Sequence, residues 1–352
     1  MPGRQTIRVL IVDDSAIVRK ILSDALAGER DLQVVGTAPD PYVARDKILA
    51  LDPDVITLDI EMPRMDGLTF LKKLMYFHPL PAIVISSLAQ PSCRAALEAL
   101  QFGAVEVLAK PGGPYSVGEL RHNLAEKIRA AAAARLRPVT PPGRPEPPAP
   151  QQQYTSTLPS DTVIAIGAST GGTEAITSVL TKFPKTAPGV VVAQHIPPEF
   201  SRAFANRLND VCALDVKEAS DGDQLRPGLA LVAPGDYHMV LRRGPGGYSV
   251  NVRSGPRVCY QRPSVDVLFQ SVAEVAGGRA IGALLTGMGA DGAQGLLKMR
   301  QAGARTLAQD EASCVVFGMP REAIERGAAE RVVSLSAMPA AILSPTARPP
   351  LN

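Results

Sequence analysis

The sequence has no tryptophan, and aromatic residues make up only 4% of its 352 residues. Its four cysteines, Cys93, Cys212, Cys259 and Cys314, lie far apart, with no Cys-x-x-Cys pair and no neighbouring histidine. This spacing argues against a zinc site or a disulfide framework and favours reduced thiols.

Long apolar runs and strong net charge are also missing. No stretch approaches the length of a membrane-spanning helix, and the start, MPGRQTIRVLIVDD, lacks the apolar core of a signal peptide. The net charge is only +3 and the basic residues are scattered, which does not indicate a nucleic-acid partner. We expect a cytoplasmic monomer that neither inserts into a membrane nor binds nucleic acid.

The length favours two domains, and the composition is that of a soluble globular protein. Between them lies RPVTPPGRPEPPAPQQQ, a proline-dense stretch that cannot supply helical hydrogen bonds and is typical of a linker. We expect a first domain over residues 1–129, a linker over 130–157, a second domain over 158–345 and a disordered tail over 346–352.

Strand and helix patterns alternate five times in the first half. Apolar runs at 8–12, 34–37, 55–58, 82–85 and 105–108 alternate with helical patterns at 16–26, 41–51, 67–75, 95–102 and 117–137. This alternation predicts an α/β domain of the doubly wound (βα)5 type, with a parallel sheet covered on both faces. Similar patterns after residue 162 predict a second parallel α/β domain.

Polar residues recur where the apolar strands of the first half end, at Asp13, Asp14, Asp59, Ser86 and Lys110. Each one alone fits a turn former, a helix cap or a solvated lysine. Together, at the carboxyl edge of one sheet, they predict a site in which clustered carboxylates bind a hard cation such as Mg²⁺ and the lysine meets an anion.

The segments IVDDS, TLDIEMPRMDG, VISS and AKP, in this order, resemble a two-component receiver domain over about residues 7–129. The resemblance implies that Asp59 accepts a phosphoryl group. It further implies an Mg²⁺ site formed by Asp13, Asp14, Asp59 and the main-chain carbonyl of Glu61, and phosphoryl contacts from Ser86 and Lys110. Receivers often carry an aromatic switch residue three positions before the lysine, where this chain has Val107. Signal transmission is therefore not expected to follow the usual aromatic route.

The second half begins with TVIAIGASTGG, an apolar strand pattern that runs into a glycine-rich turn and then a helical pattern. Ser169 has the Gly-x-Ser-x-Gly spacing of a nucleophile elbow, and backbone N–H groups at the following helix start could stabilise an oxyanion. A phosphate-cradling loop or a plain tight turn fits the same pattern, and both alternatives stay open.

A nucleophilic serine needs a base, and the chain holds four histidines. His78 and His122 belong to the first half, so the candidates are His195 and His238, which each follow a strand pattern. Asp291, in the glycine-rich TGMGADG, is the candidate to orient the base, or else a turn former before a helix.

Two other stretches are interpreted as structural. In PSVDVLF, Ser264 is the expected N-cap of a helix and Asp266 an acid in its first turn. Residues 248–252 predict an edge strand within a glycine-rich hairpin region.

The segments GASTGG, AQHIPP and TGMGADG resemble the catalytic domain of the chemotaxis protein-glutamate methylesterases, the CheB family. The resemblance implies hydrolysis of glutamate methyl esters on methyl-accepting chemotaxis receptors, and many members also deamidate receptor glutamines. Ser169 would attack the ester, His195 would transfer the proton and Asp291 would orient the imidazole, with Thr170 and Met288 shaping the cleft. Hydrolysis would need no cofactor, since the implied Mg²⁺ belongs to the receiver.

The partners follow from the same resemblance, and a hypothesis of regulation follows from the two-domain layout. A chemotaxis histidine kinase would phosphorylate Asp59, and the unphosphorylated receiver would cover the catalytic cleft. Two alternatives remain: an output half that binds a partner or DNA without catalysis, and an esterase of broader specificity. No helix-turn-helix pattern with a basic recognition helix follows the linker, which argues against DNA.

Overall fold

The computed structural model describes residues 6–110, 117–136 and 154–344. The chain divides into two compact units, Met1–Pro145 and Glu146–Asn352. The proline-dense core of the expected linker, 137–153, and the expected tail, 346–352, lie outside the described residues. None of the helices described is long and apolar enough to cross a membrane.

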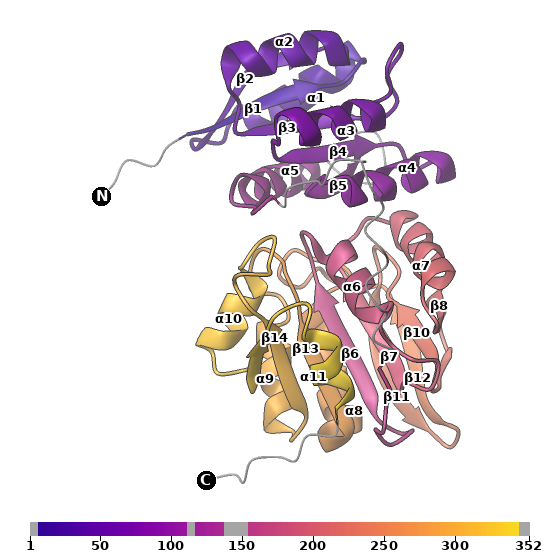
Figure 1. Ribbon diagram of the computed structural model, residues 1–352. Helices are drawn as coiled ribbons and strands as arrows, with labels where there is room; N and C mark the ends of the chain where they lie inside the picture. Colours follow the sequence, from indigo (N-terminus) through magenta and orange to yellow (C-terminus); the bar gives the residue numbers. More distant parts are fainter. Residues whose placement is uncertain (1–5, 111–116, 137–153, 345–352) are drawn as a thin grey trace. The chain divides into compact units, whose positions relative to one another are not determined.

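The first unit is built on a five-stranded parallel sheet with the strand order β2-β1-β3-β4-β5 (Figure 1). Its elements are β1 (Ile7–Val12), α1 (Ala16–Leu26), β2 (Leu32–Ala38), α2 (Pro41–Leu51), β3 (Val55–Asp59), α3 (Gly67–Phe77), β4 (Ala82–Ser86), α4 (Gln90–Gln101), β5 (Glu106–Ala109) and α5 (Val117–Ala132). Every residue of β3 and β4 is buried, so both faces at the sheet centre are covered. The predicted fivefold alternation is confirmed.

The largest differences from the predicted helix boundaries in this unit are at the start of α4 and the end of α5. Helix α4 begins at Gln90 rather than at residue 95, because Pro91 lies in its first turn, where a missing N–H costs no intrahelical hydrogen bond. Helix α5 ends at Ala132 rather than at residue 137. The position of the usual aromatic switch, Val107, is buried within β5.

The second unit contains a seven-stranded parallel sheet, β15-β14-β13-β6-β7-β10-β8, and a three-stranded antiparallel sheet, β11-β12-β9. Its elements are β6 (Val163–Ala168), α6 (Gly172–Leu180), β7 (Gly189–Gln194), α7 (Phe200–Val211), β8 (Asp215–Glu218), β9 (Gln224–Leu225), β10 (Leu229–Val232), β11 (His238–Gly244), β12 (Gly247–Arg253), α8 (Val265–Ala276), the 3-10 helix Gly277–Arg279, β13 (Ala280–Leu284), α9 (Ala293–Gln301), β14 (Arg305–Gln309), α10 (Met319–Glu325), β15 (Arg331–Val333) and α11 (Met338–Leu343). A parallel α/β domain is thus confirmed.

The expectation of an edge strand at residues 248–252 is wrong, because β12 is the central strand of the small sheet. Tyr248 pairs with Arg243 of β11 on one side and with Leu225 of β9 on the other. Strand β9 has only two residues, too few for an alternating pattern to reveal it in the sequence.

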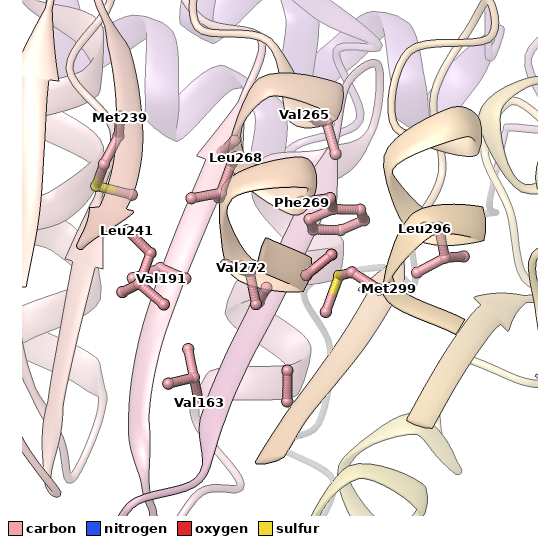
Figure 2. Close-up of a cluster of buried hydrophobic side chains, with 14 of the residues drawn as sticks. Val163, Val191, Met239, Leu241, Val265, Leu268, Phe269, Val272, Leu296 and Met299 are labelled. Atoms are coloured by element: carbon pink, nitrogen blue, oxygen red, sulfur yellow. The ribbon is translucent and has the colours of Figure 1, made fainter. Parts of the chain in front are cut away.

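Helix α8 contributes the largest apolar face to the core of this unit. Figure 2 shows Leu268, Phe269 and Val272 of α8 among buried residues of β6, β7, β11 and α9. The first turn of α8 reaches the carboxyl end of β6, because Gly167 has no side chain: a Cβ there would lie 2.1 Å from Val265 Cγ1. The start of α8 therefore lies at the sheet edge where β6 ends.

Candidate active site

The strand order β13-β6-β7 brings three loops together at one edge of the large sheet. Ala168 of β6 pairs with Gln194 of β7, and the N–H of His195 donates to Ala168 O over 3.1 Å. On the other side, the N–H of Ser169 donates to Thr286 O over 3.0 Å. Ser169 therefore leaves its strand between the loop that carries His195 and the loop that carries Asp291.

Ser169 lies in a tight turn between β6 and α6, the strand–turn–helix context of a nucleophile elbow. Gly171 in this turn has φ +75°, a left-handed conformation that suits glycine. The carbonyl of Ser169 accepts hydrogen bonds from Gly172 N (2.6 Å) and Gln194 Nε2 (2.9 Å). Since the N–H groups of Ser169 and Gly172 are both engaged, neither is available to an oxyanion without rearrangement.

His195 is paired with Asp291, as its Nε2 lies 2.7 Å from Asp291 Oδ2 and both side chains are 2% exposed. An ionised carboxylate only accepts, so Nε2 carries the proton and Nδ1 of the neutral ring keeps a lone pair. Nδ1 is buried and has no hydrogen-bond partner among the described residues. This histidine thus presents a free acceptor, the atom that a general base requires.

The second candidate base, His238, is engaged elsewhere. Its Nδ1 accepts from the N–H of Ser264 (3.3 Å), and its Nε2 donates to Pro256 O (2.9 Å). With both ring nitrogens bonded to the backbone, His238 has no lone pair left for a hydroxyl. Of the two candidates, His195 is the one with a ring nitrogen that has no hydrogen-bond partner in the described part of the chain.

The carboxylate of Asp291 lies at the N-terminus of α8. Its Oδ2 accepts from Val265 N (2.7 Å) besides His195, and its Oδ1 accepts from Asp266 N (3.0 Å) and from Ser264 Oγ (2.8 Å). Burial disfavours the charged form, but it is outweighed by the hydrogen bond from His195, by the charge that His195 carries whenever it is protonated, and by the donors of Asp266 and Ser264. Together they hold the pKa of Asp291 below its usual range. A helix N-terminus stabilises an anion in the same direction.

Two other predicted site residues lie in the loops around this pair. Thr170 is fully buried, and its carbonyl accepts from Thr286 Oγ1 over 3.0 Å. Met288 is half-buried in the loop that also carries Asp291. Sequence reasoning missed the contacts of Gln194 with the Ser169 carbonyl and of Ser264 with Asp291.

In the first unit, the residues predicted for the phosphoryl site also meet at one sheet edge. Oxygen atoms of Asp13, Asp14 and Asp59 lie within 4.8 Å of one another. Lys110 Nζ is 2.7 Å from Asp59 Oδ2 and 3.9 Å from Asp13 Oδ2. The hydroxyl of Ser86 is fully buried and makes only long contacts with Ser87 O (3.4 Å) and Ser92 O (3.3 Å). Glu61 N donates to Asp59 Oδ1 over 3.0 Å.

The electrostatics of this edge fit a cation. Burial, followed by the charge of Asp59, raises the pKa of Asp13 to about 6. Burial likewise raises the pKa of Asp59 above its usual value, although Lys110 opposes this. Asp13 Oδ2 is buried without a hydrogen-bond partner in the described part of the chain. A divalent cation would satisfy this oxygen and remove the repulsion among the carboxylates.

Comparison with known proteins identifies relatives of both units. Residues 164–342 match the family model of the CheB methylesterase, and residues 9–121 match that of the response regulator receiver domain. Protein-glutamate methylesterase/protein-glutamine glutaminase 2 of Syntrophus aciditrophicus (strain SB) is 56% identical over 332 residues, which cover 94% of this chain and 97% of that protein. The protein-glutamate methylesterase/protein-glutamine glutaminase of Escherichia coli (strain K12) is 52% identical over 332 residues, covering 94% of each chain.

A solved structure supports the fold of the second unit. The crystal structure of the Thermotoga maritima CheB methylesterase catalytic domain matches with a TM-score of 0.51 and 36% sequence identity. It covers 52% of this chain and 97% of that one. The region that matches is therefore the unit that contains Ser169, His195 and Asp291.

Proposed function

This chain belongs to the CheB methylesterase family, and on that premise we propose that it hydrolyses glutamate methyl esters on methyl-accepting chemotaxis receptors. The observation that carries the proposal is the buried His195–Asp291 pair, with an unpaired Nδ1, beside the turn that holds Ser169. Relatives are also named for glutaminase activity, and we propose deamidation of receptor glutamines at the same site.

The reaction follows the order of acyl transfer through a serine. Ser169 Oγ attacks the ester carbonyl, and His195 Nδ1 takes the hydroxyl proton. The imidazolium returns that proton to the departing methoxide, which leaves as methanol. Water, deprotonated in turn by His195, then attacks the acyl carbon. The bond from that carbon to Ser169 Oγ breaks, the imidazolium returns its proton to Ser169 Oγ, and a glutamate side chain is released. Asp291 keeps the ring in the tautomer with Nε2 protonated throughout.

A glutamine side chain fits the same steps with ammonia as the leaving group. The electrophilic δ-carbon is identical, and only the group that receives the proton from His195 differs. Hydrolysis itself requires no cofactor in this scheme.

We propose that Asp59 of the first unit accepts a phosphoryl group from a chemotaxis histidine kinase. Asp13, Asp14, Asp59 and the main-chain carbonyl of Glu61 would hold Mg²⁺, which when bound supplies positive charge to the phosphoryl oxygens. Ser86 and Lys110 would contact those oxygens, and Lys110 would exchange its ion pair with Asp59 for one with the phosphoryl group. We further propose that the protein acts as a cytoplasmic monomer.

Replacement of Asp59 by asparagine should abolish stimulation by a small phosphodonor and Mg²⁺ while leaving basal turnover unchanged, because the amide cannot accept the phosphoryl group. The measurement is methanol release from methylated receptor membranes, with and without the donor. Asp24→Asn, which alters an exposed aspartate on α1, is the matched control and should respond like wild type. Stimulation that persists in Asp59→Asn would show that another residue is the acceptor or that the donor acts without phosphorylation.

A protein limited to residues 158–352 should release methanol faster than the unphosphorylated full chain. This expectation rests on the proposal that the unphosphorylated receiver covers the catalytic cleft and that phosphorylation relieves the inhibition. Initial rates of the two proteins at equal concentration, without phosphodonor, are the measurement. An isolated hydrolase unit no faster than the full chain would contradict inhibition by the receiver.

A further inference from the structure

The hydroxyl of Ser264 accepts one hydrogen bond and donates another. Its Oγ accepts from Val267 N over 3.3 Å, as the N-cap of α8, and donates to Asp291 Oδ1 over 2.8 Å. A hydroxyl has one proton, and an ionised carboxylate has none to give, so the direction of the second bond is fixed. Ser264 is 1% exposed, so water does not compete for this proton.

We propose that Ser264 is a positioning residue of the hydrolase site, which holds the Asp291 carboxylate in the orientation that keeps the His195 ring correctly placed. Asp291 Oδ1 has two donors, Ser264 Oγ and the N–H of Asp266, while Oδ2 receives His195 and the N–H of Val265. The two bonds on Oδ1 prevent the carboxylate from rotating away from the imidazole. Ser264 itself acts only through Asp291.

The backbone around Ser264 supports this role. Its N–H donates to His238 Nδ1, whose Nε2 in turn donates to Pro256 O, so the backbone of Ser264 is held by a second hydrogen bond besides those of its hydroxyl. His238, which is not available as a base, therefore contributes by holding the start of α8. Two hydrogen bonds, both made by Ser264, therefore connect the buried His238 to the Asp291 carboxylate.

Other charged groups lie at the same helix start and bear on any pH measurement. Burial raises the pKa of both the Asp266 carboxyl and the Cys259 thiol, and the charge of Asp291 raises both further. The N–H of Gly295 lowers the pKa of Asp266, and the charge of Arg326, the residue after α10, lowers both. All of them remain in the variants below. Because these groups are the same in every variant, a difference in pH profile between the variants reports the loss of the Ser264 hydroxyl.

Removal of the Ser264 hydroxyl should shift the pH profile of kcat/KM in one direction. With one donor fewer, more negative charge remains on the carboxylate facing His195, which stabilises the imidazolium. The acid limb of the kcat/KM profile should therefore move to higher pH in Ser264→Ala. A role limited to helix capping would lower stability and leave this limb where it is.

The test compares Ser264→Ala, Ser264→Gly and Ser264→Thr in the full chain. Glycine retains most of the N-cap preference but has no hydroxyl, while threonine retains both functions. We expect kcat to fall about 10- to 100-fold in the alanine and glycine variants with KM little changed, and to recover in the threonine variant. Ser271→Ala, which removes another buried hydroxyl of α8, is the matched control and should leave the acid limb unmoved.

This inference rests on the proposed function only for the choice of ester substrate. Two assays therefore distinguish a failure of the inference from a failure of the proposed function. One is methanol release from methylated receptors, and the other is the rate at which a fluorophosphonate labels Ser169, which needs no receptor. Slow labelling in the alanine and glycine variants with rescue by threonine supports the inference even if no receptor ester is cleaved. A glycine variant that labels like wild type, or an acid limb that does not move, would overturn it.

Discussion

Methanol release from methylated receptors should fall about 10⁶-fold in Ser169→Ala, to the background of the assay. Alanine removes the only atom that forms the acyl-enzyme, while Thr286 and Gln194 bond only to the backbone of Ser169 and can hold the turn unchanged. Substrate binding should therefore persist. The assay should pair methanol release with co-sedimentation on receptor membranes, so that lost chemistry is distinguished from lost binding.

Ser178→Ala is the control for this substitution, because Ser178 is an exposed serine on α6, the helix that follows the nucleophile turn. It should release methanol at the wild-type rate. Turnover in Ser169→Ala within tenfold of wild type would exclude Ser169 as the nucleophile and favour a different reaction at this sheet edge. Absence of turnover in every variant, including wild type, would point to a signalling module that has kept the fold without the chemistry.

Asp291→Asn should lower kcat about 10⁴-fold with little effect on KM. The Asp291 carboxylate accepts four hydrogen bonds, two on each oxygen, and an asparagine amide must place its NH₂ group against one pair of donors. If the NH₂ faces His195, it donates to Nε2 and shifts the ring proton to Nδ1. The ring then has no lone pair for the Ser169 proton.

The His195 ring proton reports this change directly. Nitrogen-15 NMR of the imidazole should show the proton on Nε2 in wild type and on Nδ1 in Asp291→Asn. Asp215→Asn, at an exposed aspartate paired with Arg226, should leave both the spectrum and the rate unchanged. A rate for Asp291→Asn within tenfold of wild type would mean that Asp291 does not control the tautomer.

The local motifs predicted most of the fold, because the relevant signals lie within short segments. Apolar runs that stop at a polar residue predicted the ends of β3 and β7 to within one residue, and thereby placed Asp59 and His195 at sheet edges. The run before Ser169 stops at Gly167, and β6 continues through that glycine to Ala168. Helix α1 was predicted to the residue, and Ser264 was correctly predicted as the N-cap of α8.

What the sequence could not predict depends on contacts between distant segments. Ser264 and Asp291 are 27 positions apart, and nothing local in PSVDVLF indicates that this helix start meets a carboxylate. The same limit kept both His195 and His238 open as candidate bases on the residues alone, and it was the family resemblance that pointed to His195. In the structure, both ring nitrogens of His238 are hydrogen-bonded to the backbone, whereas the position of β7 beside β6 brings His195 next to the turn that holds Ser169.

The position of Asp291 at the start of α8 has a consequence for engineering. One carboxylate completes the hydrogen bonding of a core helix and also directs the histidine, so the thermal stability of this unit and its turnover depend on the same side chain. A designer who wishes to retune the reactivity of the site without loosening the core should leave this acid alone.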